Sequence, residues 1–151
     1  MPKPKIAELA QSDLDNPIIV NLAPNEVGMI TGDMNACVSV IVLFNPGATG
    51  SFQNVRGQHG AGGIASIDWD ALLQGVPMDR NTYVVVAYAK GESEHGITGI
   101  RNAVESKAKG LRKAFVEEAN CLVDRTSPIP TIKTFDRIDP PAKYDIRKQR
   151  R

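Results

Sequence analysis

The chain has 151 residues, of which 42% are hydrophobic and 23% charged, values typical of one globular domain with a buried core. The formal net charge of +1 argues against a general attraction to nucleic acid or to membrane surfaces. Two cysteines are too few for a disulfide framework, and no apolar run approaches the length of a membrane span. We therefore expect a cytoplasmic protein with free thiols, or one exported without a cleaved signal peptide.

The N-terminal third predicts a flexible segment followed by strands. Residues 1–17 are polar and contain three prolines, so we expect a flexible lead-in with at most a short helical turn at KIAELA. The runs 18–22 and 26–30 are short and β-like, with a Pro-Asn turn between them. The Val- and Ile-rich run 37–44 predicts a buried strand. A helix beginning near Cys37 is the alternative, because a short apolar run suits either structure.

A long glycine-rich segment occupies the middle of the chain. Residues 47–66 predict a loop, and loops of this length are often functional. We expect a short helix at 68–74, which Ser66 or Asp68 would cap. The run 82–89 predicts a central strand.

The C-terminal third predicts one long helix between strands. A second glycine-containing loop is expected over KGESEHGITG, residues 90–99. The three- and four-residue spacing of apolar side chains then predicts a helix over about 100–119. Strands are expected at 121–124 and 131–135, and the basic tail over 139–151 is expected to be solvated. This element order indicates a single-domain α/β or α+β fold.

Cys37 is the first candidate for chemistry, because it lies where a polar loop meets the apolar run. A side chain at the end of a rigid element is held in place, as a nucleophile requires. The competing interpretation is a small core hydrophobe, which is the commoner role of a cysteine beside valines.

His59 and Thr31 are the candidate partners of Cys37. His59 is one of two histidines, and its glycine neighbours allow a close approach of the backbone to another segment. A neutral imidazole within reach of a thiol generates the reactive thiolate. Thr31, six positions before Cys37, can accept the second ring N–H and fix the orientation of the imidazole. The alternatives are an exposed loop histidine and a turn threonine.

Metal and nucleotide sites are not expected. Cys37, His59, His95 and Cys121 lack the spacing of metal ligands. The segment RGQHGAGG lacks the Lys-Ser/Thr pair or the GxGxxG spacing of a phosphate-binding loop. We interpret His95 as a loop histidine and Cys121 as a core residue, and we expect no cofactor.

The segment TGDMNACVSVIVLF resembles the active-site segment of chemoreceptor glutamine deamidases of the CheD family. Thr31 and Cys37 match the family's spacing, and His59 follows 22 residues after Cys37, in the order of the family's histidine. Residues 98–102, TGIRN, are similar to its Ile-Gly-x-Arg-Asn helix start. Asn35-Ala36 stand where the family carries Gly-Ser. The resemblance covers residues 18–138.

This resemblance implies a catalytic domain of layered mixed β-sheets flanked by helices. It also implies hydrolysis of a protein glutamine side chain to glutamate through a Cys37 thioester, with His59 as the base and Thr31 as its orienting partner. Asn35 and Ala36 would hold the oxyanion with the Cys37 backbone N–H, and Gly60 would border the substrate.

The resemblance also suggests where the enzyme would act. Bacterial toxins such as cytotoxic necrotizing factors share this centre, so an effector acting on a host protein is a further expectation. A cysteine protease, a transglutaminase and a non-enzymatic binding module are the alternatives.

Overall fold

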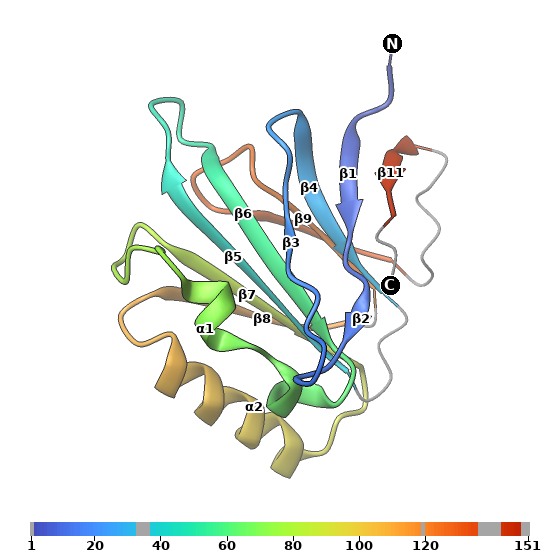
Figure 1. Ribbon diagram of the computed structural model, residues 1–151, viewed down its shortest axis with the longest axis vertical. Helices are drawn as coiled ribbons and strands as arrows, with labels where there is room; N and C mark the ends of the chain where they lie inside the picture. Colours follow the sequence, from blue (N-terminus) through green and yellow to red (C-terminus); the bar gives the residue numbers. More distant parts are fainter. Residues whose placement is uncertain (1, 33–36, 119, 136–142, 149–151) are drawn as a thin grey trace.

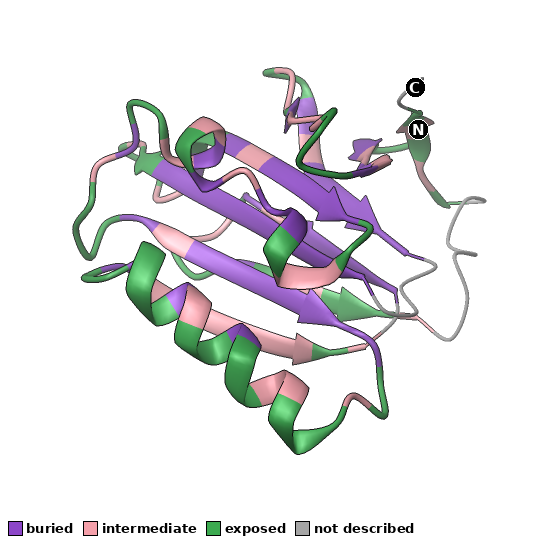
Figure 2. Cartoon of the chain, turned by 60° about the horizontal axis from the view of Figure 1, so that its bottom comes forward, coloured by how far each residue is buried: buried purple, intermediate pink, exposed green. Residues whose placement is uncertain are grey.

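The computed structural model describes residues 2–32, 37–118, 120–135 and 143–148 (Figure 1). Two β-sheets pack face to face, and the helices cover the outer face of one of them (Figure 2). Sequence reasoning predicted a single mixed α/β domain, and the structure confirms that class. None of the described helices is long and apolar enough to cross a membrane.

The first sheet has five strands in the order β10-β9-β4-β1-β11. Strand β1 pairs in parallel with β4 and β11, whereas β9 pairs antiparallel with β4 and β10. The strands are β1 (Lys5–Glu8), β4 (Glu26–Thr31), β9 (Cys121–Asp124), β10 (Thr131–Thr134) and β11 (Asp145–Arg147).

The second sheet has six strands in the order β2-β6-β5-β7-β8, with β3 also paired to β6. Its central strand β5 is antiparallel to both β6 and β7, and β8 runs parallel to β7. The strands are β2 (Gln11–Ser12), β3 (Val20–Asn21), β5 (Val38–Pro46), β6 (Phe52–Gly60), β7 (Tyr83–Tyr88) and β8 (Arg112–Glu117).

The helical layer consists of η1 (Gly63–Ser66), α1 (Trp69–Leu73) and α2 (Glu94–Lys107). The side chain of Asp68 accepts a hydrogen bond from the Ala71 N–H at 3.1 Å and so caps α1, as expected. The side chain of Ser93 caps α2 in the same way.

Strand β5 is apolar over residues 38–44 except at Ser39, because both of its faces are buried there. Val38, Val40 and Val42 pack toward the helices, whereas Ile41 and Leu43 pack toward the first sheet. A strand covered on both sides shows a continuous apolar run rather than alternation. The predicted strands at 37–44, 82–89, 121–124 and 131–135 are therefore confirmed, and no helix begins at Cys37.

Both ends of the chain differ from the sequence prediction. The expected flexible lead-in contains β1 and β2, and Ile6 and Ala7 are 0% exposed. The expected solvated tail contains β11, which pairs with β1 (Figure 1). The strands β1 and β11 pair across almost the whole length of the chain, and β1 and β2 also pair with β4 and β6, so local composition carries no sign of the pairing.

The glycine-rich segment 47–66 is not a long loop. It contains β6, which forms a hairpin with β5, so the loop shrinks to a tight turn. Gly57 serves sheet packing: a Cβ atom there would lie 3.0 Å from Met29 Sδ and 3.1 Å from Leu9 Cδ2. The glycine lets the two sheets approach closely.

The predicted helix over 100–119 is misplaced. Helix α2 begins at Glu94, inside the expected second loop, and ends at Lys107. Ala108 caps its C-terminal end, and Gly110, with φ at +86°, allows the left-handed turn that leads into the next strand. Residues 112–117 form β8 instead, because their backbone pairs in parallel with the buried strand β7.

Candidate active site

Thr31 and His59 meet between the two sheets. Thr31 is the last residue of β4, and His59 lies near the end of β6. The Oγ1 atom of Thr31 is 3.4 Å from Nδ1 of His59. The two side chains are 0% and 1% exposed. The structure therefore places the predicted orienting threonine against the predicted base, and His59 belongs to a strand rather than to the expected loop.

Ser39 is a polar member of this cluster that sequence reasoning missed. Its Oγ atom lies 2.5 Å from Thr31 Oγ1, and the side chain is fully buried. Ser39 also lies directly opposite His59 in the β5–β6 register. The signal was present in the sequence, because Ser39 is the one polar residue in the run VSVIVLF.

Cys37 immediately precedes β5 and faces the other sheet. It belongs to the apolar cluster between the sheets, with Ile41 and Ala87. Val38 pairs with Gly60 and Ser39 with His59, so Cys37 lies diagonally across from His59 on the same face. Diagonal neighbours on an antiparallel pair are roughly 7–8 Å apart.

The thiol of Cys37 is largely buried. The side chain is 9% exposed, and Sγ donates a hydrogen bond to the Ala61 carbonyl oxygen at 3.6 Å. Cys37 thus has a fixed orientation beside the end of β6.

Of the three residues expected to bind the oxyanion or the substrate, the structure describes one. Asn35 and Ala36 lie outside the described residues. Gly60 is described and packs against η1: a Cβ atom there would lie 2.9 Å from the Gly63 carbonyl oxygen and 2.9 Å from Ile67 Cδ1. Its missing side chain allows η1 to fold back on β6.

Gln58 holds this end of β6 in place from the helical side. Its Nε2 donates to the Ser66 carbonyl oxygen at 2.8 Å, and its Oε1 accepts from the Asp68 N–H at 2.7 Å. Nε2 also donates to Ser12 Oγ at 3.2 Å. Because Gln58 is fully buried and next to His59, these bonds fix the backbone that carries the imidazole.

The second cysteine lies beside the cluster, opposite Thr31 in the β4–β9 register, whereas the second histidine lies on the helical side. Burial raises the pKa of the Cys121 thiol to about 12, with a further contribution from Glu118. This agrees with the prediction of a core residue. His95 is exposed in the first turn of α2 rather than in a loop. Among the described residues, no group of three or more His, Cys, Asp or Glu side chains could hold a metal ion.

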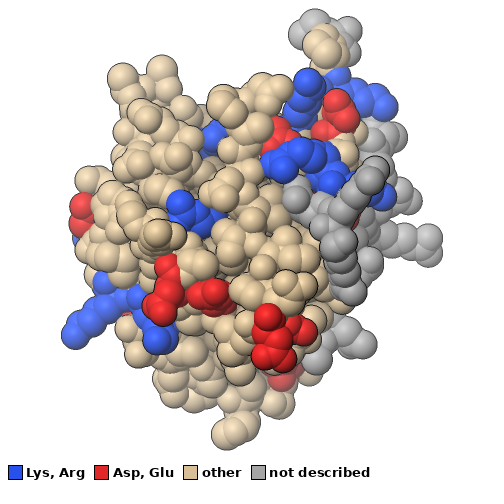
Figure 3. Space-filling model, in the orientation of Figure 1, with Lys and Arg blue, Asp and Glu red and all other residues tan. Residues whose placement is uncertain are grey.

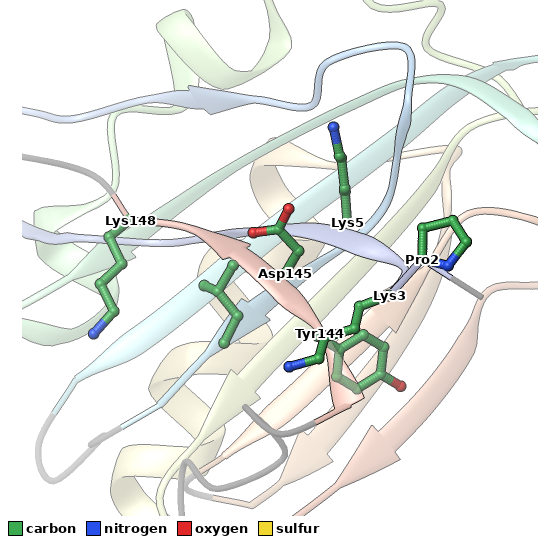
Figure 4. Close-up of a pocket in the computed structure, with 7 residues that line it drawn as sticks. Pro2, Lys3, Lys5, Tyr144, Asp145 and Lys148 are labelled. Atoms are coloured by element: carbon green, nitrogen blue, oxygen red, sulfur yellow. The ribbon is translucent and has the colours of Figure 1, made fainter.

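A separate cavity of about 520 Å³ lies between the N-terminal residues and β11. Figure 4 shows that Lys3, Lys5 and Lys148 direct their amino groups away from one another. Their charges do not converge on one point, so the cavity is not built to hold an anion. None of its lining residues belongs to the cluster of Thr31, Ser39 and His59.

The chain matches no model of a known protein family, and no curated protein matches it.

Proposed function

We propose that the protein is a cysteine-dependent deamidase that hydrolyses a glutamine side chain of another protein to glutamate. The observation that carries the proposal is the buried contact of 3.4 Å between Thr31 Oγ1 and His59 Nδ1, with Cys37 on the same face of the β5–β6 pair. A threonine on the ring Nδ1 turns Nε2 toward the nucleophile side, as in a triad. These residue types and their order are those that the CheD resemblance implies.

The proposed reaction has two halves, formation of a thioester on Cys37 and its hydrolysis, and His59 transfers protons in both. His59 takes the thiol proton of Cys37, and the thiolate attacks the amide carbon of the substrate. His59 then gives the proton to the departing ammonia, which leaves a glutamyl thioester. A water molecule, deprotonated by His59, hydrolyses the thioester and restores the thiol. The backbone N–H of Cys37 is the proposed donor to the oxyanion.

The buried setting of the cluster supports this assignment. A hydrogen bond between side chains that exclude water is stronger than the same bond at the surface. When Thr31 accepts the Nδ1–H of His59, its own hydroxyl proton is available to Ser39. A chain from Ser39 through Thr31 to His59 would hold the imidazole in one tautomer.

The rate of iodoacetamide alkylation at Cys37 tests the proposed thiol–imidazole pair. We expect rapid labelling of the wild type near neutral pH, because the imidazole of the proposed pair would take the thiol proton as the reagent is attacked. Replacement His59→Ala should slow labelling at about pH 6.5 by roughly 10- to 100-fold, since an unassisted cysteine is only about 1% thiolate at that pH. Peptide mapping by mass spectrometry separates Cys37 from Cys121.

The matched control for this measurement is His95→Ala. His95 is exposed on α2 and lies outside the cluster, so its removal should leave the labelling rate unchanged. Slow labelling in the wild type that does not change in His59→Ala would contradict the proposal. Cys37 would then be a packing residue, and a binding module would be the better interpretation.

Replacement Ser39→Ala is expected to weaken the orientation of His59 without removing any proposed reacting group. We expect alkylation of Cys37 to slow by about 3- to 10-fold, the effect of one lost hydrogen bond. The tautomer of His59, measured from long-range ¹H–¹⁵N couplings, should change at the same time. If Ser39 acts through Thr31, adding Ser39→Ala to Thr31→Val should cause no further slowing. Additive effects of the two replacements would show that Ser39 does not act through Thr31.

A further inference from the structure

An apolar groove of about 490 Å³ lies between α2, the η1–α1 turn and the segment that follows β2. We call it the η1 groove. Ile64, Ile67, Trp69 and Ala103 line it, and Leu14 stands at its edge with 55% of its surface exposed. A leucine left in water beside a hollow of apolar side chains is typical of a surface that a partner covers.

The η1 groove carries the same charge pattern on two of its sides. Leu14 lies between Asp13 and Asp15, and Trp69 lies between Asp68 and Asp70. Figure 3 shows acidic clusters across the lower front of the molecule, over α1 and the segment after β2. One basic residue, Lys107, is among the residues that line the groove. Two aspartates and one lysine thus line the groove itself, and Asp13 and Asp15 flank Leu14 at its edge.

Two of the four aspartates serve the local fold, and two do not. Asp13 accepts a hydrogen bond from the Asn16 N–H at 3.0 Å, and Asp68 caps α1. Within the described part of the chain, the carboxylates of Asp15 and Asp70 form no hydrogen bond or ion pair, and both residues are exposed. Their carboxylates are therefore available to a partner.

We propose that the η1 groove docks a basic, amphipathic segment of a partner protein. Apolar side chains of that segment would cover Leu14 and Trp69, and its lysines or arginines would meet Asp15 and Asp70. A buried apolar centre with a charged rim is the usual arrangement of a specific interface. The rim charges would favour basic partners and speed their association.

The segment that follows β2 also lines a second hollow, which lies beside the candidate active site. Asp13, next to Leu14, lines a smaller polar hollow of about 240 Å³ with Ser12 and Ala61. The carbonyl oxygen of Ala61 is the hydrogen-bond acceptor of the Cys37 thiol. A segment docked in the groove would thus continue past Asp13 toward Cys37. Identifying the docked segment as the substrate rests on the proposed deamidase function, whereas docking itself does not.

Trp69 provides a direct probe, because it is the only tryptophan in the chain. We would titrate the full-length Cys37→Ser variant with short synthetic peptides that combine leucines, lysines and a central glutamine. Two matched sets would carry glutamate in place of lysine, or serine in place of leucine. We expect a saturable change of Trp69 fluorescence with the basic, leucine-containing set only, and weaker binding at high salt.

Variants of the groove should weaken this binding. We expect Asp15→Asn and Asp70→Asn to raise the Kd by about 2- to 5-fold each, the effect of one exposed charge pair. The control is Asp145→Asn, which removes an equal charge from β11 in the other sheet. Equal binding of the acidic peptides, an equal effect of Asp145→Asn, or no saturable change with any basic peptide would overturn the proposal.

The outcomes for docking and for catalysis are separable. Saturable docking together with an unreactive Cys37 would support the η1 groove and contradict the deamidase function. A reactive Cys37 without docking would support the proposed thiol–imidazole pair and reject the groove as its substrate site.

Discussion

Replacement of Cys37 by serine is expected to abolish conversion of protein glutamine to glutamate while the fold persists. The serine hydroxyl is far less acidic than a thiol, so the base would have to act on a much weaker nucleophile. Loss of a nucleophile typically lowers turnover by a thousandfold or more, and we expect an effect of about this size. Serine can still donate to the Ala61 carbonyl oxygen that now accepts the thiol, so the cost in stability should be about 1 kcal/mol.

Mass spectrometry of a protein extract treated with the wild type or with Cys37→Ser provides the measurement. Deamidation adds about one dalton to a glutamine-containing peptide, through loss of ammonia and gain of water. The matched control is Cys121→Ser, which changes the thiol whose pKa burial raises to about 12. Activity that follows Cys121 rather than Cys37 would refute the assignment. Peptide cleavage or cross-linking, with no deamidation, would indicate a protease or a transglutaminase instead.

Three of the strands that sequence reasoning located are buried on both faces. The runs that contain β5 and β7 lie between the helices and the other sheet, so their buried positions are apolar except at Ser39. The third such strand, β9, has Cys121 and Val123 in the cluster between the sheets and Leu122 on the opposite face. Continuous burial leaves a local trace that needs no knowledge of the partner strand.

The strands that were missed have polar composition or distant partners. Strand β6 contains Gln53, Asn54 and Arg56, so its sequence has the composition of a loop, although β5 and β3 pair with it. Strands β1 and β11 pair with each other from opposite ends of the chain. Pairing of this kind depends on the whole fold and is not encoded in any short window.

The candidate site was predicted in part. The resemblance named Thr31, Cys37 and His59, and the structure places all three on facing sheets with a direct Thr31–His59 contact. The resemblance did not name Ser39, because the role of that residue follows from the register that places it opposite His59. The η1 groove could not be predicted from the sequence either. Leu14 and Trp69 are far apart in the sequence and line the same groove only in the folded chain.

An ion pair between Arg147 of β11 and Glu26 of β4 joins the C-terminal strand to the first sheet and should contribute to stability. Nε and Nη2 of Arg147 donate to the two carboxylate oxygens of Glu26 at 2.9 Å and 2.8 Å. Glu26 is 4% exposed, and one of its oxygens also accepts from the Ala23 N–H at 2.8 Å. The hydrogen bond from Arg147, opposed by burial, lowers the pKa of Glu26 below its ordinary value.

Replacement Arg147→Ala is expected to lower the free energy of unfolding by about 2–3 kcal/mol. The change leaves a buried carboxylate without its main partner, and such losses typically cost about 3–5 kcal/mol. We expect the lower value because the Arg147 side chain is 43% exposed and water screens part of the interaction. Urea denaturation measures the change. The control is Glu105→Gln, which breaks the surface pair with Lys113 and should cost less than about 1 kcal/mol.

The pH dependence of stability separates the ion pair from simple packing. Because folding lowers the pKa of Glu26, the stabilisation is fully present above the ordinary pKa of about 4.5 and is lost as pH falls through the folded value. The wild type should therefore lose more stability between pH 7 and pH 3 than Glu26→Gln, which cannot titrate at this position. Parallel curves for the two proteins would mean that Glu26 is protonated alike in the folded and unfolded chains. Arg147 would then hold β11 by packing and by its bond to the Asn21 carbonyl oxygen alone.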